Sequence, residues 1–420
     1  MTLRKYGCQC FLLATSEIAD LHAPVPHPNL GQEIAPALLP AMLFMRQSFG
    51  DQCWSNPRRC ATVTIDDPLL RPRYGFLSYD RLVTAMRTHR FASTIAFIPW
   101  NYRRSDSATA ELFRRNRDIL SICTHGCNHS AGEFGIRDRR ILRAKARLAL
   151  ERAQRHKQIT GVGCDPIMIF PQGAFSNSAL PALRAEGYLA AVNTSVHPTD
   201  PDDGGPTLRD LLDVAVTRAG FPLFARRYPR SIAEFALDLF LGKPVLITAH
   251  HQNFRDDAHE ISQWADRINS IDPDLTWAPL GTTLRSTALH RRTGPHTGEV
   301  RFFTDELDLV NPYTEPAVLS LSKQIDSGIS PAGVLVDGCA IDFEANAGSL
   351  TTRLTLAPHA KVDLKIVNVN HGGALSAGTL HHREPGIAAR RYLSEFRDNY
   401  LARSDLLTAL SHKAARLIPR

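Results

Sequence analysis

Short apolar runs alternate with segments of helical periodicity from residue 60 to about residue 285, and this alternation constrains the fold more than any other feature of the sequence. Short apolar runs bounded by turns are typical of buried strands, whereas apolar residues spaced three or four apart are typical of amphipathic helices. The predicted strands are 61–65, 93–98, 119–123, 167–170, 189–192, 245–249 and 275–278, and the predicted helices between them are 79–88, 108–117, 139–158, 178–186 and 231–239. Strands and helices that alternate in this way predict a parallel sheet or a barrel.

Three further regions flank this part of the chain, which we assign to residues 60–285. Residues 1–59 are predicted to be an irregular N-terminal lead-in with one apolar stretch at 35–49. Residues 286–384 contain stretches in which apolar and polar residues alternate, at 350–356 and 361–367, and this pattern predicts a smaller antiparallel β-rich module. Residues 385–420 are predicted to form an amphipathic basic helix, from about residue 388 to residue 417.

Composition excludes several classes of protein. The 420 residues, 43% hydrophobic and 22% charged, are typical of a globular chain with more than one domain. No apolar run approaches the ~20 residues that span a bilayer, so no transmembrane segment is expected. We recognise no signal peptide, because the apolar stretch at 10–14 is too short, and eight cysteines without a dense framework fit a reducing cytoplasm. The net charge of +7 is spread along the chain without a base-reading motif, so no nucleic-acid partner is expected.

Polar residues that can carry chemistry follow several of the predicted strands. In α/β folds with parallel strands, active residues gather at the carboxyl ends of the strands. We therefore expect the residues at these ends to lie close together. They are Asp66 and Asp67 after the first strand, His125 and His129 after the third, Pro171, Gln172 and Gly173 after the fourth, and His250 and His251 after a late strand.

Two of these groups point to a metal. Asp66 and Asp67 repel each other, so a pair at the end of a buried strand is costly unless a cation or hydrogen-bond donors neutralise it. His125 and His129 are four residues apart, a spacing that on a helical turn places both imidazoles on one face, within reach of one ion. The spacing of the histidines alone fits a purely structural pair equally well.

Taken in this order, the motifs resemble the polysaccharide deacetylase family, the metal-dependent carbohydrate esterases with the NodB homology domain. The family's motifs are a Thr-Phe-Asp-Asp, a His-Ser/Thr-x-x-His, an Arg-x-Pro-x-Gly and a Leu-x-His at a strand end. The chain has Thr64-Ile65-Asp66-Asp67, then His125-Gly126-Cys127-Asn128-His129, then Ile169-Phe170-Pro171-Gln172-Gly173, and finally Ile247 to His250 or, one residue on, His251. The resemblance covers about residues 60–285. The third motif lacks the family's Arg, and no Asp-x-Trp motif is found, although Asn193-Thr194 lies about where it would fall.

The resemblance implies a distorted (β/α) barrel of the polysaccharide deacetylase type, followed by the β-rich module and the C-terminal helix. It implies that Asp67, His125 and His129 bind a divalent metal, usually Zn²⁺. Asp66 would be the general base and His250 or His251 the general acid, while a backbone N–H near Gly173 would help to stabilise an oxyanion. Because the Arg of the third motif is missing, Asp66 must find another donor, or the enzyme works differently.

The resemblance further implies a carbohydrate substrate, such as a bacterial surface polysaccharide, from which an N- or O-acetyl group is removed. We expect the substrate to contact Phe170, Pro171, Gln172, Gly173 and Trp100, since aromatic side chains beyond strand ends can stack on sugar rings. Two other functions stay open: a metal hydrolase of a non-sugar amide or C–N bond on the same barrel, and a carbohydrate-binding protein without catalysis. The sequence also leaves a homo-oligomer open.

Overall fold

The structure is a computed structural model that describes residues 2–5, 8–11, 19–25, 30–200, 205–328, 331–346, 348–368 and 385–403. All of the predicted site residues lie within these ranges. The end of the predicted C-terminal helix, after residue 403, lies outside them.

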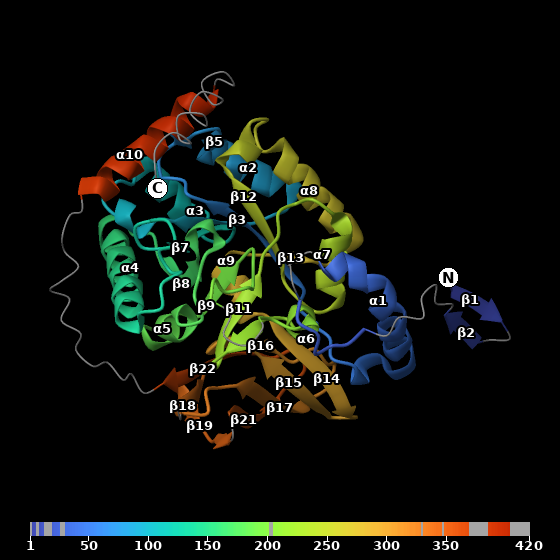
Figure 1. Cartoon of the computed structure of the whole chain (residues 1–420). Coiled ribbons are helices and arrows are strands. Elements are labelled where there is room, and N and C mark those ends of the chain that lie inside the picture. Colours follow the sequence, from blue (N-terminus) through green and yellow to red (C-terminus); the bar gives the residue numbers. More distant parts are fainter. Residues whose placement is uncertain are drawn as a thin grey trace.

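A nine-stranded sheet, parallel except for one edge pair, forms the centre of the molecule (Figure 1). Its order is β10-β11-β9-β8-β7-β6-β3-β12, with β13 paired to β3 beside this path. Its strands are β3 (Cys60–Asp66), β6 (Ser93–Phe97), β7 (Leu120–His125), β8 (Cys164–Ile169), β9 (Ala190–Asn193), β10 (Val216–Arg218), β11 (Phe221–Ala225), β12 (Val245–His250) and β13 (Thr276–Trp277). The carboxyl ends of the parallel strands therefore meet at one edge of the sheet, which is where the predicted site residues lie.

Helices pack on the outside of this sheet and bury its apolar residues. One core lies between β3, β6 and β12 and the helices on that side, and a second lies between β8, β9 and β11 and the helices α4 and α5. The other face of the sheet is covered by Leu280 and Leu284 of α9 and by Leu289 of the strand that follows. The helices are α2 (Tyr79–His89), α3 (Ser107–Arg115), α4 (Arg139–Thr160), α5 (Ala179–Ala185), α6 (Leu208–Leu212), α7 (Ile232–Phe240), α8 (His259–Ile271) and α9 (Leu280–Arg285).

The α/β architecture with a parallel sheet is confirmed, but the predicted distorted barrel is not. Among the described strands, pairing runs from β10 to β12 without closing. The edge of β11 that would face β12 is occupied by β10, which pairs with it in antiparallel fashion. One isolated bridge, between Arg227 just after β11 and Ile247 of β12, joins the two ends of the sheet. This bridge carries the chain after β11 across to the carboxyl ends of β3 and β12.

Two smaller sheets follow and enclose a separate apolar core that includes Val300, Leu319 and Leu364. Their pairings are antiparallel, apart from the parallel pair of β15 and β17. The first sheet contains β14 (Ala288–Gly294), β15 (Thr297–Phe302), β17 (Ala317–Gln324), β21 (Ser349–Leu356) and β20 (Glu344–Asn346), and the second contains β16 (Glu306–Val310), β22 (Lys361–Asn368), β18 (Pro331–Val336) and β19 (Cys339–Ile341).

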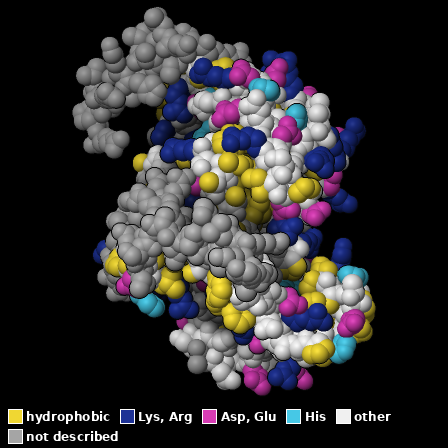
Figure 2. Space-filling model, turned by 90° about the vertical axis from the view of Figure 1, so that its right-hand side faces the viewer, with side chains coloured by type: hydrophobic (Ala, Val, Ile, Leu, Met, Phe, Trp, Pro, Cys, Tyr) yellow, Lys and Arg dark blue, Asp and Glu magenta, His cyan; other side chains and the backbone are white. Residues whose placement is uncertain are grey.

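The remaining elements come from the two ends of the described chain. β1 (Thr2–Lys5) and β2 (Cys8–Phe11) form a hairpin, α1 (Leu30–Phe49) follows, and the short strands β4 (Arg73–Tyr74) and β5 (Leu77–Ser78) pair before α2. α10 (Pro385–Asn399) lies over the end of the sheet that carries the predicted site (Figure 1). No helix of the described ranges combines the length and apolar character needed to cross a membrane. On the face drawn in Figure 2, basic and acidic side chains are interspersed over the described part of the surface.

Candidate metal centre

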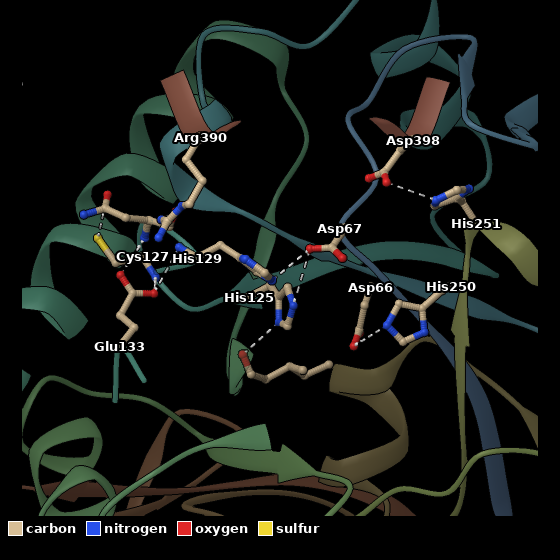
Figure 3. A network of polar contacts seen from close by, with 12 residues as sticks. Asp66, Asp67, His125, Cys127, His129, Glu133, His250, His251, Arg390 and Asp398 are labelled. Atoms are coloured by element: carbon tan, nitrogen blue, oxygen red, sulfur yellow. Dashed lines mark hydrogen bonds and ion pairs between the residues drawn. The ribbon is translucent and has the colours of Figure 1, made fainter. Parts of the chain in front are cut away.

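Asp67, His125 and His129 come together at the carboxyl ends of two strands (Figure 3). Asp67 is the first residue after β3, and His125 is the last residue of β7. The Oδ1 atom of Asp67 lies 3.1 Å from Nε2 of His129 and 3.7 Å from Nε2 of His125. One ligand atom from each of the three residues lies within 4.8 Å of the other two. Among the described residues, this is the group of His, Cys, Asp and Glu side chains whose spacing fits an ion.

The spacing of the two histidines predicts a helical turn, but the chain between them is not helical. After β7 the chain turns sharply at Gly126, with φ +63°, and His129 itself has φ +57°. A side chain at Gly126 would meet Oε2 of Glu133 at 2.3 Å and the Pro171 ring at 2.5 Å, so glycine is required at this position. The departure from the family's Ser or Thr here therefore has a local steric reason.

The buried carboxylate of Glu133 holds this turn in place (Figure 3). It accepts hydrogen bonds from three successive backbone amides, those of Cys127 at 2.9 Å, Asn128 at 2.8 Å and His129 at 3.1 Å. Backbone amides that converge on one carboxylate fix the direction of the chain between them. The orientation of His129 therefore depends on a residue four positions further along the chain.

The three residues fit a divalent metal in their protonation states as well as in their spacing. Nδ1 of His125 is 3.0 Å from the carbonyl oxygen of Ile169, which can only accept, so Nδ1 carries the proton and Nε2 is free to act as a ligand. Burial lowers the pKa of His125 to about 4, so the ring is neutral at physiological pH. Burial raises the pKa of Asp67, but the facing histidines outweigh it and hold that pKa below its ordinary value. Oδ1 of Asp67 is buried without a hydrogen bond of good geometry, as expected of an oxygen that faces a metal position.

Asp66 finds its donor in Arg226, which comes just after β11. Nη1 and Nη2 of Arg226 each lie 2.6 Å from a different oxygen of Asp66, a bidentate pair in which both side chains are buried. Nη1 also donates to the Thr64 hydroxyl at 3.0 Å. Burial raises the pKa of Asp66, but the Arg226 guanidinium and the neighbouring histidines keep it below its ordinary value. Asp66 is therefore ionised at neutral pH.

The two late histidines lie in different surroundings (Figure 3). Nε2 of His250 is 3.9 Å from Oδ2 of Asp66, and its side chain is 34% exposed. The His250 ring is stacked at 6.1 Å on Tyr228. His251 is buried, stacks on Phe76, and has its Nε2 3.5 Å from Oδ1 of Asp398 in α10. The structure thus brings His250 to Asp66, and it turns His251 toward α10.

The expected substrate contacts are only partly at the surface. Phe170 is fully buried and stacked on Phe175, so the expectation that it stacks on a sugar is not met. Its ring belongs to the core beneath α4 and α5, because the last residue of a buried strand run turns inward as readily as outward. Trp100 is partly exposed and packs edge-on against Tyr392 of α10.

The turn after β8 lies beside the His125 loop. Pro171 is buried, while Gln172 is exposed and has φ +58°. Nδ2 of Asn193 donates to the Gly173 carbonyl at 2.9 Å and so holds the turn from the end of β9. Asn193 thus lies about where the family's Asp-x-Trp motif would fall.

Arg226 and Glu133 were not predicted from the sequence. A signal for Arg226 was present, because it follows the apolar run at 221–225 as the predicted site residues follow theirs. The run at 221–225 is not among the predicted strands, and Pro222 within it is unfavourable for a paired strand. Glu133 carries no comparable signal, since its role depends on a turn that the spacing does not reveal.

No protein-family model matches the chain, and no curated protein matches it either. Solved structures do match. A family 4 carbohydrate esterase from Streptomyces lividans in complex with acetate is 13% identical, with a TM-score of 0.31 over 52% of this chain and 91% of its own. A family 4 acetyl xylan esterase from Clostridium thermocellum in complex with a cobalt ion is 13% identical, with a TM-score of 0.30 over 53% and 88%.

A pseudoenzyme of the same esterase family from Bacillus anthracis also matches, with 10% identity and a TM-score of 0.33 over 55% of this chain and 67% of its own. These matched structures have TM-scores of 0.30 to 0.33. They are distant, so we argue the function from the site itself.

Proposed function

We propose that the protein is a metal-dependent hydrolase that removes an N- or O-acetyl group from a carbohydrate. The observation that carries this proposal is the juxtaposition of two carboxylates with different environments at the end of β3. Asp67 faces two imidazole Nε2 atoms, and its neighbour Asp66 is paired with Arg226. An Asp/His/His set with an ionised carboxylate beside it is the arrangement that metal-assisted hydrolysis requires.

Asp67, His125 and His129 would hold the metal. When bound, a divalent ion such as Zn²⁺ supplies a Lewis acid that polarises a carbonyl group and makes water more acidic. Asp66 would accept the proton of the attacking water, since it is ionised and lies beside the ligands. Arg226 would keep Asp66 oriented and keep it ionised until that proton arrives.

His250 would donate a proton to the departing sugar nitrogen or oxygen. It is partly exposed and so can meet a substrate, and its Nε2 faces Asp66. Tyr228 stacks on its ring and limits the directions in which the imidazole can turn. His251 is a poorer choice for this role, because it is buried against α10.

Two variants test this proposal by separating metal binding from turnover. His125→Ala should lose stoichiometric zinc, measured by elemental analysis after dialysis, because it removes a ligand with a preset tautomer. Asp66→Asn should keep the zinc but release acetate at a rate reduced by roughly 100-fold or more from an acetylated oligosaccharide. His251→Gln is the matched control for a His250→Gln variant, and only His250→Gln should slow acetate release strongly.

Other outcomes would favour the other functions. Stoichiometric zinc without acetate release from any acetylated glycan would favour hydrolysis of a non-sugar amide or C–N bond. Glycan binding by a protein that takes up no zinc would favour a carbohydrate-binding protein and would contradict the proposal.

A further inference from the structure

The helix α10 presents charged side chains to the protein and apolar side chains to solvent, which is the reverse of an ordinary surface helix. Arg391, Glu395 and Asp398 are spaced four and three residues apart, lie on one face, and are 2%, 8% and 3% exposed. The opposite face carries the exposed apolar residues Tyr392, Leu393 and Phe396. Buried charges are costly unless each one is paired, so the partners of the three buried residues decide what this face does.

Two of the three have partners. Glu395 forms a bidentate ion pair with Arg104, in which Nη2 lies 2.7 Å from Oε2. Asp398 accepts from the Tyr74 hydroxyl at 2.7 Å and faces Nε2 of His251 at 3.5 Å. These contacts anchor α10 over the carboxyl ends of the strands. Figure 3 shows Arg390 and Asp398 on α10 above the Asp67 carboxylate.

The third, Arg391, has no such partner. Within the described parts of the chain, no carboxylate lies at ion-pair distance from its guanidinium, and its buried Nε has no hydrogen-bond acceptor. It lies between two contacts of α10 with the surroundings of the candidate metal centre: Nη2 of Arg390 is 3.4 Å from the carbonyl oxygen of Asn128, and Asp398 faces His251. The buried Arg391 side chain therefore lies on the protein-facing side of α10, with hydrogen-bonding capacity unused at its Nε.

The charges around the site leave this cation uncompensated. Asp66 and Arg226 neutralise each other. The one charge of Asp67 cannot neutralise both a divalent metal and the Arg391 guanidinium. A buried cation without a partner is costly, so an anion from outside the chain would stabilise it.

We propose that Arg391 binds a negatively charged group of the substrate, so that the protein acts on an anionic carbohydrate. This inference rests on the function proposed above and specifies its substrate class. The planar fork of a guanidinium suits both a carboxylate, as in a uronic acid, and a phosphate on the sugar. Placed over the metal centre by α10, it would orient the acetyl group of such a glycan toward Asp66.

The experiment uses the His250→Gln protein, with and without zinc, so that binding is measured with little turnover while Asp66 keeps its pairing with Arg226. Two pairs of probes differ in charge. Hyaluronan hexasaccharide carries carboxylates whereas chitohexaose is neutral, and N-acetylglucosamine 6-phosphate carries a phosphate whereas N-acetylglucosamine does not. Calorimetric titration gives the affinity for each probe. We expect the charged member of one pair to bind roughly tenfold tighter than its neutral counterpart, as one charge-assisted contact provides.

Arg391→Gln should abolish this preference. Arg391→Lys should keep part of it, because the charge remains without the fork. Arg353→Gln, which removes the same charge from an exposed position on β21, should keep all of it. The pair that shows the preference distinguishes a carboxylate from a phosphate. Equal affinity within both pairs would overturn the proposal. A preference that persists in Arg391→Gln would also overturn it, provided that the Arg391→Lys protein is folded.

The failure of this inference and the failure of the proposed function give different results. Acetate release by the protein with His250 intact, without any charge preference, would overturn the role of Arg391 alone. A charge preference that depends on Arg391, without acetate release, would overturn the hydrolase function alone.

Discussion

Adjacent carboxylates at the end of β3 differ because their side chains point to different neighbours. Asp66, the last residue of β3, faces Arg226, whereas Asp67, the first residue after the strand, faces the histidines. Asp67 also adopts a positive φ of 81°, which is uncommon for a residue other than glycine and is typical of functional sites. The pair is thus tolerated because a guanidinium neutralises Asp66, while Asp67 faces the two imidazoles of the candidate metal centre.

A prediction at this scale concerns Glu133. Glu133→Gln replaces one carboxylate oxygen by an NH₂ group, which cannot accept from the amides of residues 127–129. We expect zinc affinity to fall about 10- to 100-fold, because residues that orient metal ligands typically contribute this much. Competition with a chromogenic chelator measures it.

Glu111→Gln is the control, since it makes the same change on the exposed surface of α3. If Glu133→Gln bound zinc as tightly as this control, the prediction that Glu133 positions His129 for zinc binding would be contradicted.

The residues that local patterns placed at strand ends are found there, whereas their long-range partners could not be predicted. Asp67 and His125 follow apolar runs that are visible in the sequence. The pairing of Arg226 with Asp66 depends on how β11 meets β12, across 160 residues of chain. Their functional roles remain proposals.

Among the elements, α10 contributes the contacts that join the C-terminal region to the site. The predicted helix ran from about residue 388 to residue 417, whereas α10 begins at Pro385 and ends at Asn399. Asn399 accepts from the Gly75 amide at 2.8 Å and donates to the Glu395 carbonyl, so its side chain is engaged where the helix ends. The periodicity indicated a helix, but not that its buried face would be charged or that it would cover the metal centre.

The ion pair between Glu395 and Arg104 is predicted to hold α10 in place. Glu395→Gln leaves the largely buried Arg104 charge without its partner, which is strongly destabilising for this contact. Backbone amides of α10 should then exchange with solvent at least several-fold faster in hydrogen-exchange mass spectrometry. Leu393→Gln, on the exposed face of the same helix, should leave the exchange unchanged. Equal protection of α10 in both variants would show that this pair does not anchor it.

At the scale of the whole molecule, the sheet places every candidate site residue at one end of the fold. The predicted distorted barrel is not confirmed, because closure of a sheet depends on which edges are free. β10 pairs with β11 and occupies an edge, and no local pattern reveals this. The general α/β architecture was accessible because it depends on the alternation of strands and helices along the chain.

The stability of the whole molecule should decrease as the pH falls from about 6.5 to about 4. Burial lowers the pKa of both His156 and His290 to about 4, from an ordinary value of 6.5. Between these two values the unfolded chain binds protons that the native chain does not, so acid favours unfolding, and the effect levels off below pH 4.

His290→Leu should reduce this pH dependence by up to about 1.4 kcal/mol per pH unit, the contribution of one proton. Urea unfolding at a series of pH values measures it. His359→Leu is the control, since His359 is exposed, and should leave the dependence as in the wild type. A pH profile that is the same in all three proteins would contradict the prediction.

The central claim is that acetate release depends on one metal ion held by Asp67, His125 and His129. The most direct measurement is the initial rate of acetate release from an acetylated oligosaccharide as zinc is added back in steps to metal-free protein. We predict a rate that rises from near zero and levels off at one equivalent of zinc per chain. Full activity in the metal-free protein, or zinc bound to saturation without acetate release, would contradict the account.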